Sequence, residues 1–243
     1  MGASFLWGLL AGSSLVLGGL LTYWLHIGPR VLGLIMAFGA GVLISAVAFE
    51  LVHEAFTTTA GDGGVGLGLF LGSCVFLSGD ALIDRLGGAD RKRSGGNQAA
   101  GSALAIVLGT VLDGIPEALV LGLTVLEAGK VNAAFLVAVF LSNLPESIAA
   151  TTGLSKAGWA KSRVLGLWTI VAVACGLSAL AGYALLDGAT PHTIALVLSF
   201  AGGAILTMLA DTMMPEAFEH GGRLVGFFTT AGFALAFGIS SIA

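Results

Sequence analysis

Two similar stretches decide the fold of this chain: V-L-D-G-I-P-E-A-L-V at residues 111–120 and F-L-S-N-L-P-E-S-I-A-A-T at residues 140–151. Both are too hydrophobic for a helix that faces water, yet both carry acidic side chains near the middle. A carboxylate at the centre of a bilayer costs roughly 2.5 to 3.5 kcal/mol even on the mildest insertion scale. We therefore expect these acids to mark a substrate pathway, a proton relay or an ion site.

The composition indicates an integral membrane protein. Hydrophobic residues make up 56% of the 243 residues and charged residues only 10%, whereas about a quarter of the residues of a soluble domain are charged. The mean hydropathy is +0.99. Because a membrane-spanning helix needs about 20 residues, the sequence predicts an all-α membrane protein of about eight transmembrane helices, with short joints and no soluble domain.

The predicted spans are separated by joints rich in glycine, proline and charged residues. The spans lie at about 4–25, 31–55, 64–86, 99–127, 131–154, 163–187, 191–217 and 222–241. If both termini are extracytoplasmic, nine of the ten Lys and Arg residues fall in inner joints and only Lys130 falls in an outer one. This distribution satisfies the positive-inside rule. It predicts a multi-pass protein of the cell (plasma or inner) membrane. The N-terminus M-G-A-S-F-L-W has no basic segment, so we expect a retained first span and no cleaved signal.

An internal repeat supports this order of spans. Residues 37–56 align without gaps on residues 199–218 at an offset of 162, and both segments end in E-A-F. The first copy is predicted to run outward and the second inward. We therefore expect one transmembrane transporter domain in a 3+2+3 inverted-repeat arrangement, made of residues 1–86, a central helix pair at 99–154, and residues 163–243. Inverted repeats of this kind are common in secondary transporters.

Helical spacing groups the polar side chains of the two central spans into oxygen clusters. Asp113 and Glu117 are four residues apart and share one helix face. Ser142 and Asn143 precede Glu146 by four and three residues in the same way. Two antiparallel neighbours would bring the clusters face to face, and the proline in each cluster loosens a backbone carbonyl beside them. All ten Lys and Arg residues fall in joints, so we expect no basic partner for these acids and predict neutralisation by a bound cation or by protons.

Residues outside the two cassettes have separate interpretations. The thirty-eight glycines indicate close helix packing, either within the chain or in a homodimer. Cys74 and Cys175 stand alone in apolar runs and are interpreted as small packing residues. Asp80 and Asp84, four residues apart near the predicted inner surface, could assist the exit of an ion.

Taken together, these patterns resemble the ZIP (Zrt/Irt-like) family of divalent-metal transporters. The resemblance rests on the two central P-E cassettes and the basic joint after the third span. It also rests on G-A-G-V-L-I-S-A-V-A-F-E-L-V-H-E-A at 39–55 and A-G-G-A-I-L-T-M-L-A-D-T-M-M-P-E-A at 201–217. It implies eight helices in a 3+2+3 arrangement, a mononuclear or binuclear metal site on the fourth and fifth spans, and passage of metal into the cytoplasm.

The chain departs from the usual pattern of that family at several metal-binding positions. The fourth span of the family usually reads H-N-x-P-E-G, where this chain has D-G-I-P-E-A, and the fifth usually opens with His or Gln before Asn or Asp, where this chain has Ser142. The resemblance therefore implies one metal site, with the adjoining second site incomplete. Its predicted ligands are Asp113, Glu117, Ser142, Asn143 and Glu146. The family usually carries zinc or iron, but an all-oxygen set gives manganese equal weight.

Polar residues also end the second and seventh spans. His53 and Glu54 lie at the predicted outer face, and Asp211 and Glu216 at the inner face. As metal ligands these four residues would form an entry funnel and an exit station. As structural groups they would be ordinary helix-end residues that meet water.

Two other function classes are less consistent with the sequence. A cation/proton exchanger fits the acids but not the cassette pattern. An intramembrane metal-dependent hydrolase needs a water-activating motif, but the dipeptide His53-Glu54 lacks the second histidine of H-E-x-x-H. We therefore expect that the protein is not an enzyme, that it has no cofactor other than a transported Zn, Fe or Mn ion, and that it has no nucleic-acid partner. The expected partners are divalent metal ions, the lipid bilayer and a second copy of the chain in a homodimer.

Overall fold

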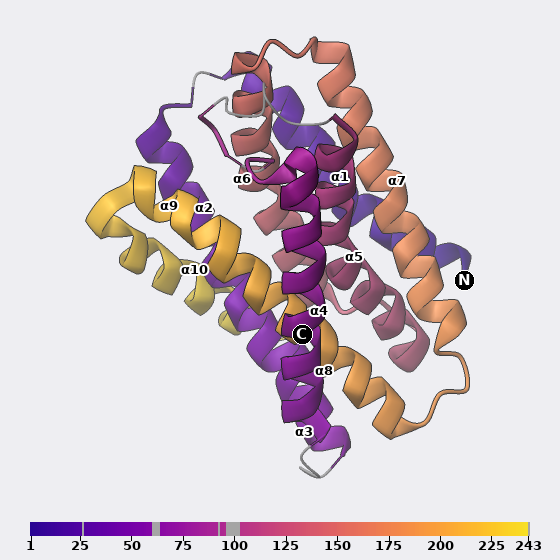
Figure 1. Cartoon of the computed structure of the whole chain (residues 1–243). Helices are drawn as coiled ribbons and strands as arrows, with labels where there is room; N and C mark the ends of the chain where they lie inside the picture. Colours follow the sequence, from indigo (N-terminus) through magenta and orange to yellow (C-terminus); the bar gives the residue numbers. More distant parts are fainter. Residues whose placement is uncertain (26, 60–63, 92, 96–102, 243) are drawn as a thin grey trace.

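The computed structural model describes residues 1–25, 27–59, 64–91, 93–95 and 103–242. Within these ranges the chain is almost entirely helical and has no strand (Figure 1). The α-helices are α1 (Gly2–Trp24), α2 (Pro29–Ala46), α3 (Glu54–Thr58), α4 (Gly64–Ile83), α5 (Ala103–Ala128), α6 (Ala133–Lys156), α7 (Lys161–Leu185), α8 (Pro191–Met208), α9 (Met214–Gly221) and α10 (Val225–Ser240). In the described ranges, some of them are joined or extended by π-helical segments at Val47–His53, Asp84–Gly88 and Leu209–Met213 and by a 3-10 turn at Gly222–Leu224.

The chain is an all-α, multi-pass membrane protein. Seven helical stretches among the described residues are long and apolar enough to cross a bilayer. They are Gly2–Trp24, Pro29–Thr58, Gly64–Gly88, Leu104–Ala128, Ala133–Lys156, Lys161–Leu185 and Pro191–Ser240. The first six agree with the predicted spans to within a few residues, apart from the predicted start of the fourth span at 99, which lies outside the described residues.

The last stretch covers two of the predicted spans, 191–217 and 222–241. Pro191–Ser240 is 50 residues of nearly continuous helix. Gly222 interrupts it with φ 61° and ψ −141°, a backbone conformation that glycine adopts far more readily than other residues. The chain turns back at this point, so that α9 and α10 form a hairpin (Figure 1).

Helix starts and helix shapes recur along the chain at the offset of the sequence repeat. Pro29 and Pro191, 162 residues apart, stand at the first turn of α2 and α8, where the missing N–H of proline costs nothing. The π-helical segments that follow these two helices begin at Val47 and Leu209, again 162 residues apart. Turns of π-helix are rare and are often found at functional sites.

Close helix pairs form the bundle. The most extensive contacts are those of α1 with α7, α2 with α10, and α4 with α8. Glycine allows two of these approaches, because a Cβ atom at Gly41 would overlap the carbonyl oxygen of Thr229 in α10, and one at Gly203 would overlap that of Leu69 in α4. Such contacts bring helix backbones together where lipid supplies no hydrophobic drive for association.

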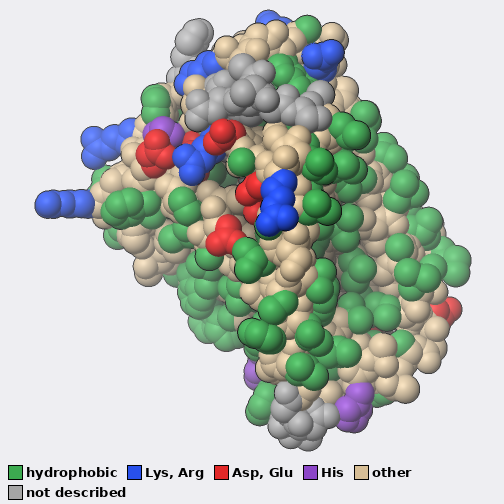
Figure 2. Space-filling view, in the orientation of Figure 1, with side chains coloured by type: hydrophobic (Ala, Val, Ile, Leu, Met, Phe, Trp, Pro, Cys, Tyr) green, Lys and Arg blue, Asp and Glu red, His purple; other side chains and the backbone are tan. Residues whose placement is uncertain are grey.

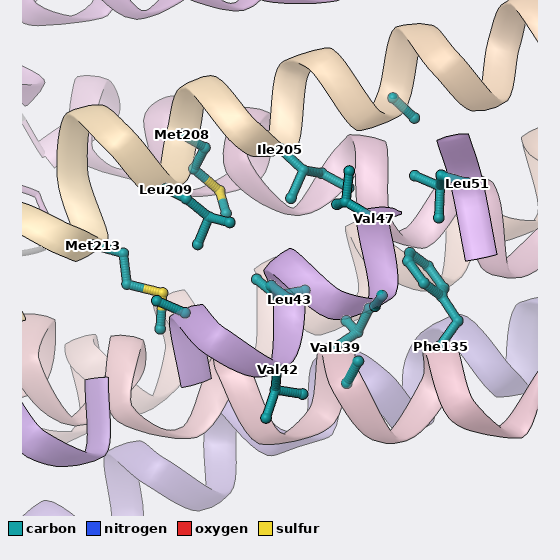
Figure 3. Packing of buried hydrophobic residues seen from close by; sticks show 14 of the residues in the cluster. Val42, Leu43, Val47, Leu51, Phe135, Val139, Ile205, Met208, Leu209 and Met213 are labelled. Carbon is teal, nitrogen blue, oxygen red and sulfur yellow. The ribbon is translucent and has the colours of Figure 1, made fainter. Parts of the chain in front are cut away.

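The core lies where α2, α6 and α8 meet (Figure 3). Leu43, Val139 and Ile205 project into it from these three helices, and each is at most 2% exposed. Outside the core, hydrophobic side chains cover much of the surface, and Leu67 and Phe70 of α4 are more than half exposed. On the face shown in Figure 2, hydrophobic side chains dominate the lower half, while most charged side chains gather in the upper half. This distribution suits a protein with a lipid-facing belt and one strongly charged end.

Candidate functional site

The acids of α5 lie deep inside the bundle. Asp113 and Glu117 are both 2% exposed, on the same face of the helix. Pro116 lies beside them, within a helix that continues on both sides. At 1.5 Å per residue, Asp113 lies about 15 Å along the helix from Ala103, its first described residue. The structure therefore places both carboxylates well within the apolar length of α5.

On α6 the three predicted ligands point to different partners. Glu146 is 8% exposed and lies near the middle of the helix. The hydroxyl of Ser142 donates to the carbonyl oxygen of Val139, 3.0 Å away in the same helix. The side-chain amide of Asn143 donates to the carbonyl oxygen of Ala11 in α1 at 3.4 Å. In this arrangement Asn143 joins α6 to α1.

The two central helices are not packed face to face, contrary to the sequence-based expectation. Helix α5 packs mainly on α7 and α6 mainly on α1, while α1 and α7 pack on each other. Small residues make this possible. A Cβ atom at Gly12 of α1 would lie 3.1 Å from the Cβ of Cys175, and one at Gly114 of α5 would lie 3.1 Å from its sulfur. Cys175 of α7 therefore fills the space between the helices.

Cys175 lies against the α5 cassette, because its sulfur is next to Gly114. Its side chain is 5% exposed. In the sequence Cys175 stands alone in an apolar run, which predicts a packing residue. The structure supports that packing role.

Asp113 has a basic partner, so the expectation that the acids of the two central spans have none is wrong for this residue. Arg91 follows α4, is 1% exposed, and donates to both carboxylate oxygens of Asp113, from Nε at 2.9 Å and from Nη2 at 3.0 Å. Nη2 also contacts Asp80, and Nη1 lies 3.5 Å from Asp84. The error arises because Arg91 lies in a joint by sequence, yet its side chain is buried and reaches Asp113 of α5.

The guanidinium of Arg91 remains charged in this environment. Burial by itself lowers its pKa, but the charges and hydrogen bonds of Asp113 and Asp80 raise it more, so the pKa lies above its ordinary value. A planar guanidinium suits this position because it binds both oxygens of a carboxylate at once. One buried positive charge therefore serves several carboxylates at this end of the bundle.

The residues around Arg91 cross this end of the bundle, and we call the described residues 89–91 and 93–95 the strap. Ser94 donates to Glu216 of α9 from its backbone N–H at 2.9 Å and from its hydroxyl at 2.6 Å. The ammonium group of Lys156, at the end of α6, donates to the carbonyl oxygen of Ser94 at 2.8 Å. The strap is thus tied to α9 and α6 by Ser94 and to α4 and α5 by Arg91.

The Ser94, His220 and Glu216 side chains do not form a nucleophile relay. Nε2 of His220 lies 3.0 Å from the hydroxyl of Ser94 and 3.1 Å from Oε1 of Glu216. A relay needs one ring nitrogen for the serine and the other for the acid, but here one nitrogen contacts both. The hydroxyl of Ser94 also donates directly to the carboxylate. The geometry fits a structural clamp that fixes the strap to α9.

The opposite end of the bundle contains an acidic cavity of about 490 Å³. Glu50, Glu54 and Glu127 line it, together with Lys130 and Asn132. Glu50, in the first π-helical segment, accepts hydrogen bonds from the side-chain amide of Asn132 and from the hydroxyl of Ser240. The α5–α6 turn and the end of α10 are therefore both tied to Glu50 beside the cavity.

The helix-end residues predicted as an entry funnel and an exit station have different surroundings. Glu54 is exposed and lines the cavity, whereas Glu216 is 4% exposed beneath the strap. His53 and Asp211 are both exposed, each in a π-helical segment. Among the described residues, no group of three or more His, Cys, Asp and Glu side chains is placed to hold a metal ion. The pairing of Asp113 with Arg91 is one reason that the predicted ligands do not form a single cluster here.

Comparison with known proteins adds no relative from which a role could be transferred. No family model matches the sequence, and no curated protein matches it.

Proposed function

We propose that this chain transports divalent metal cations (zinc, iron or manganese) across the cell membrane into the cytoplasm, as a transporter similar to the ZIP family. The observation that carries the proposal is the burial of Glu117 and Glu146 near the middle of two separate membrane helices. Ionisable groups within membrane helices mark substrate pathways or proton relays by default. Carboxylate oxygens are ligands that zinc accepts.

The proposal includes eight membrane crossings in a 3+2+3 inverted repeat. The turn at Gly222 supports a division of Pro191–Ser240 into two crossings. The helix contacts support the repeat. When α2 is exchanged with α8 and α4 with α10, the α2–α10 contact becomes the α8–α4 contact, which is also present. When α1 is exchanged with α7 and α5 with α6, the α1–α6 contact becomes the α7–α5 contact in the same way. The matched π-helical segments at Val47 and Leu209 point the same way.

The two ends of the bundle suggest one state of a transport cycle. The strap end carries Arg91, Arg93 and Lys156, and the positive-inside rule assigns such an end to the cytoplasm. The cavity lined by Glu50, Glu54 and Glu127 then opens outward and would collect cations. In this assignment both termini are extracytoplasmic, and the metal moves from the cavity to Glu117 and Glu146 before it leaves past the strap.

The test is uptake of Zn²⁺, Mn²⁺, Fe²⁺, Mg²⁺ and Cd²⁺ by proteoliposomes at two pH values. The native protein is compared with Glu117→Gln and Glu146→Gln, which keep the size of the side chain and remove its charge. Saturable uptake of one divalent ion, lost at least a hundredfold in both variants, is the expected result. Uptake that is unchanged in both variants would contradict the proposal. A proton flux without any divalent requirement would favour a cation/proton exchanger instead.

A further inference from the structure

The closed end of the bundle contains a charge arrangement that the proposed function does not by itself require. Arg91 is bound to the carboxylate of Asp113, one helical turn before Glu117 on the same face of α5. The positive charge of Arg91 neutralises the carboxylate of Asp113 from the cytoplasmic side, as a departing cation would. Unlike a departing cation, this charge is attached to the chain through the strap.

The structure provides a fitted position for this side chain. Gly109 of α5 faces Arg91, and a Cβ atom there would lie 2.7 Å from Nε of the arginine, closer than real Cβ contacts allow. The carbonyl oxygen of Gly88 accepts from Nη1 at 3.4 Å. Asp80 and Asp84 contact the guanidinium from α4 and its π-helical extension. The polar contacts of the guanidinium are thus with acidic side chains and a backbone carbonyl oxygen.

We infer that Arg91 is a tethered cation that closes the inner end of the pathway, and that an ion leaves the bundle only when the strap withdraws the guanidinium from Asp113. The inference rests on the proposed function for the identity of the ion. Its geometric content is independent of that identity, because it concerns which element blocks access from the cytoplasm to the middle of the bundle.

The strap is also held in place by contacts outside the Arg91–Asp113 ion pair. Ser94 joins the strap to Glu216, and Lys156 holds its carbonyl oxygen. A change in these contacts moves the segment that carries Arg91. Arg93 provides a matched control, because it lies in the same strap, carries the same charge, and is exposed, with Asp90 and Glu219 at 3.5 and 3.6 Å.

The experiment measures access to Cys175 of α7, which lies against Gly114 in the α5 cassette, in purified protein that carries Cys74→Ala. A water-soluble cationic methanethiosulfonate reports the rate of Cys175 labelling in the native background and in Arg91→Gln, Gly109→Ala and Arg93→Gln. Gly109→Ala displaces the arginine side chain and changes no charge. The expected result is labelling at least tenfold faster in Arg91→Gln, clearly faster in Gly109→Ala, and within twofold of the native rate in Arg93→Gln.

Native labelling rates in Arg91→Gln and Gly109→Ala would overturn the inference. If Arg91→Gln does not fold, Gly109→Ala decides the outcome alone by the same criterion.

Adding Zn²⁺ or Mn²⁺ to the labelling experiment separates the inference from the proposed function. Protection of Cys175 at a concentration at least tenfold lower in Arg91→Gln than in the native protein supports both. Fast labelling that neither ion slows supports the closure by Arg91 and contradicts metal transport.

Discussion

The two ends of the bundle are built on repeated segments but differ in how far they are closed. Glu54 and Glu216 occupy the same place in the internal repeat, 162 residues apart. Glu54 is exposed in a cavity of about 490 Å³, whereas Glu216 is buried beneath Ser94. The strap makes the difference, because it follows α4 and lies over the second copy of the repeat. One framework can therefore present an open end and a closed end at the same time.

Removal of the charge of Arg91 is expected to have the largest effect on stability. Arg91→Gln leaves the buried carboxylates of Asp113 and Asp80 without their guanidinium, and breaking a buried ion pair on one side costs about 3 to 5 kcal/mol. Thermal unfolding in detergent should show a large fall in Tm. The double variant Arg91→Gln with Asp113→Asn should recover much of the loss. Equal Tm values for the native protein and Arg91→Gln would show that the ion pair does not hold this end closed.

The shared framework should respond equally at both copies of the repeat. Gly41→Ala and Gly203→Ala each force a Cβ atom against a backbone carbonyl of a neighbouring helix, and overpacking of this kind costs about 1 to 3 kcal/mol. Gly66 is the control, because a Cβ atom there meets nothing within 4 Å. Unfolding of the three variants in detergent tests this. A large loss at one glycine only would count against an equivalent framework.

The equivalent acids should respond unequally. Glu216→Ala removes the acceptor of two hydrogen bonds from Ser94, each worth about 1 kcal/mol. Glu54→Ala changes an exposed side chain and should alter the free energy of unfolding by less than about 0.5 kcal/mol. Thermal unfolding compares the pair directly. If Glu54→Ala were the more destabilising variant, the assignment of open and closed ends would be reversed.

The smallest stability effect is expected at the open end. Ser240→Ala removes one hydrogen bond to Glu50, so the loss should be about 1 kcal/mol or less. Asn132 should still donate to the same carboxylate. Amide hydrogen exchange of α10 gives a local readout, with faster exchange at its C-terminal end. Unchanged exchange there would show that the contact does not hold α10 beside the cavity.

The sequence was sufficient for the all-helical membrane class and for most helix boundaries, because composition and apolar run length determine both. It also located the buried acids of α5 and α6, since a carboxylate within an apolar run is conspicuous. Pairing across long sequence distances was not predictable. Ser94 and Glu216 are 122 residues apart, and nothing in either segment indicates the other. The position of α1 and α7 between α5 and α6 depends on small residues whose partners only the three-dimensional packing identifies.

Arg91 illustrates a further limit of sequence reasoning. A count by joints and spans assigns each basic residue to one side of the membrane, but an arginine side chain is long enough to reach well beyond its own backbone. All three residues at positions 91–93 are basic. No feature of the sequence distinguishes the buried Arg91 from the exposed Arg93. Only the fold of the strap separates them.

The central claim is that a divalent cation binds between Glu117 and Glu146 in the middle of the membrane. The most direct measurement is anomalous X-ray diffraction at the zinc absorption edge from crystals of the native protein grown with Zn²⁺. We predict a peak at about 2.0 to 2.2 Å from carboxylate oxygens of both residues. Zinc peaks confined to the surface, with none between these two side chains, would contradict the claim.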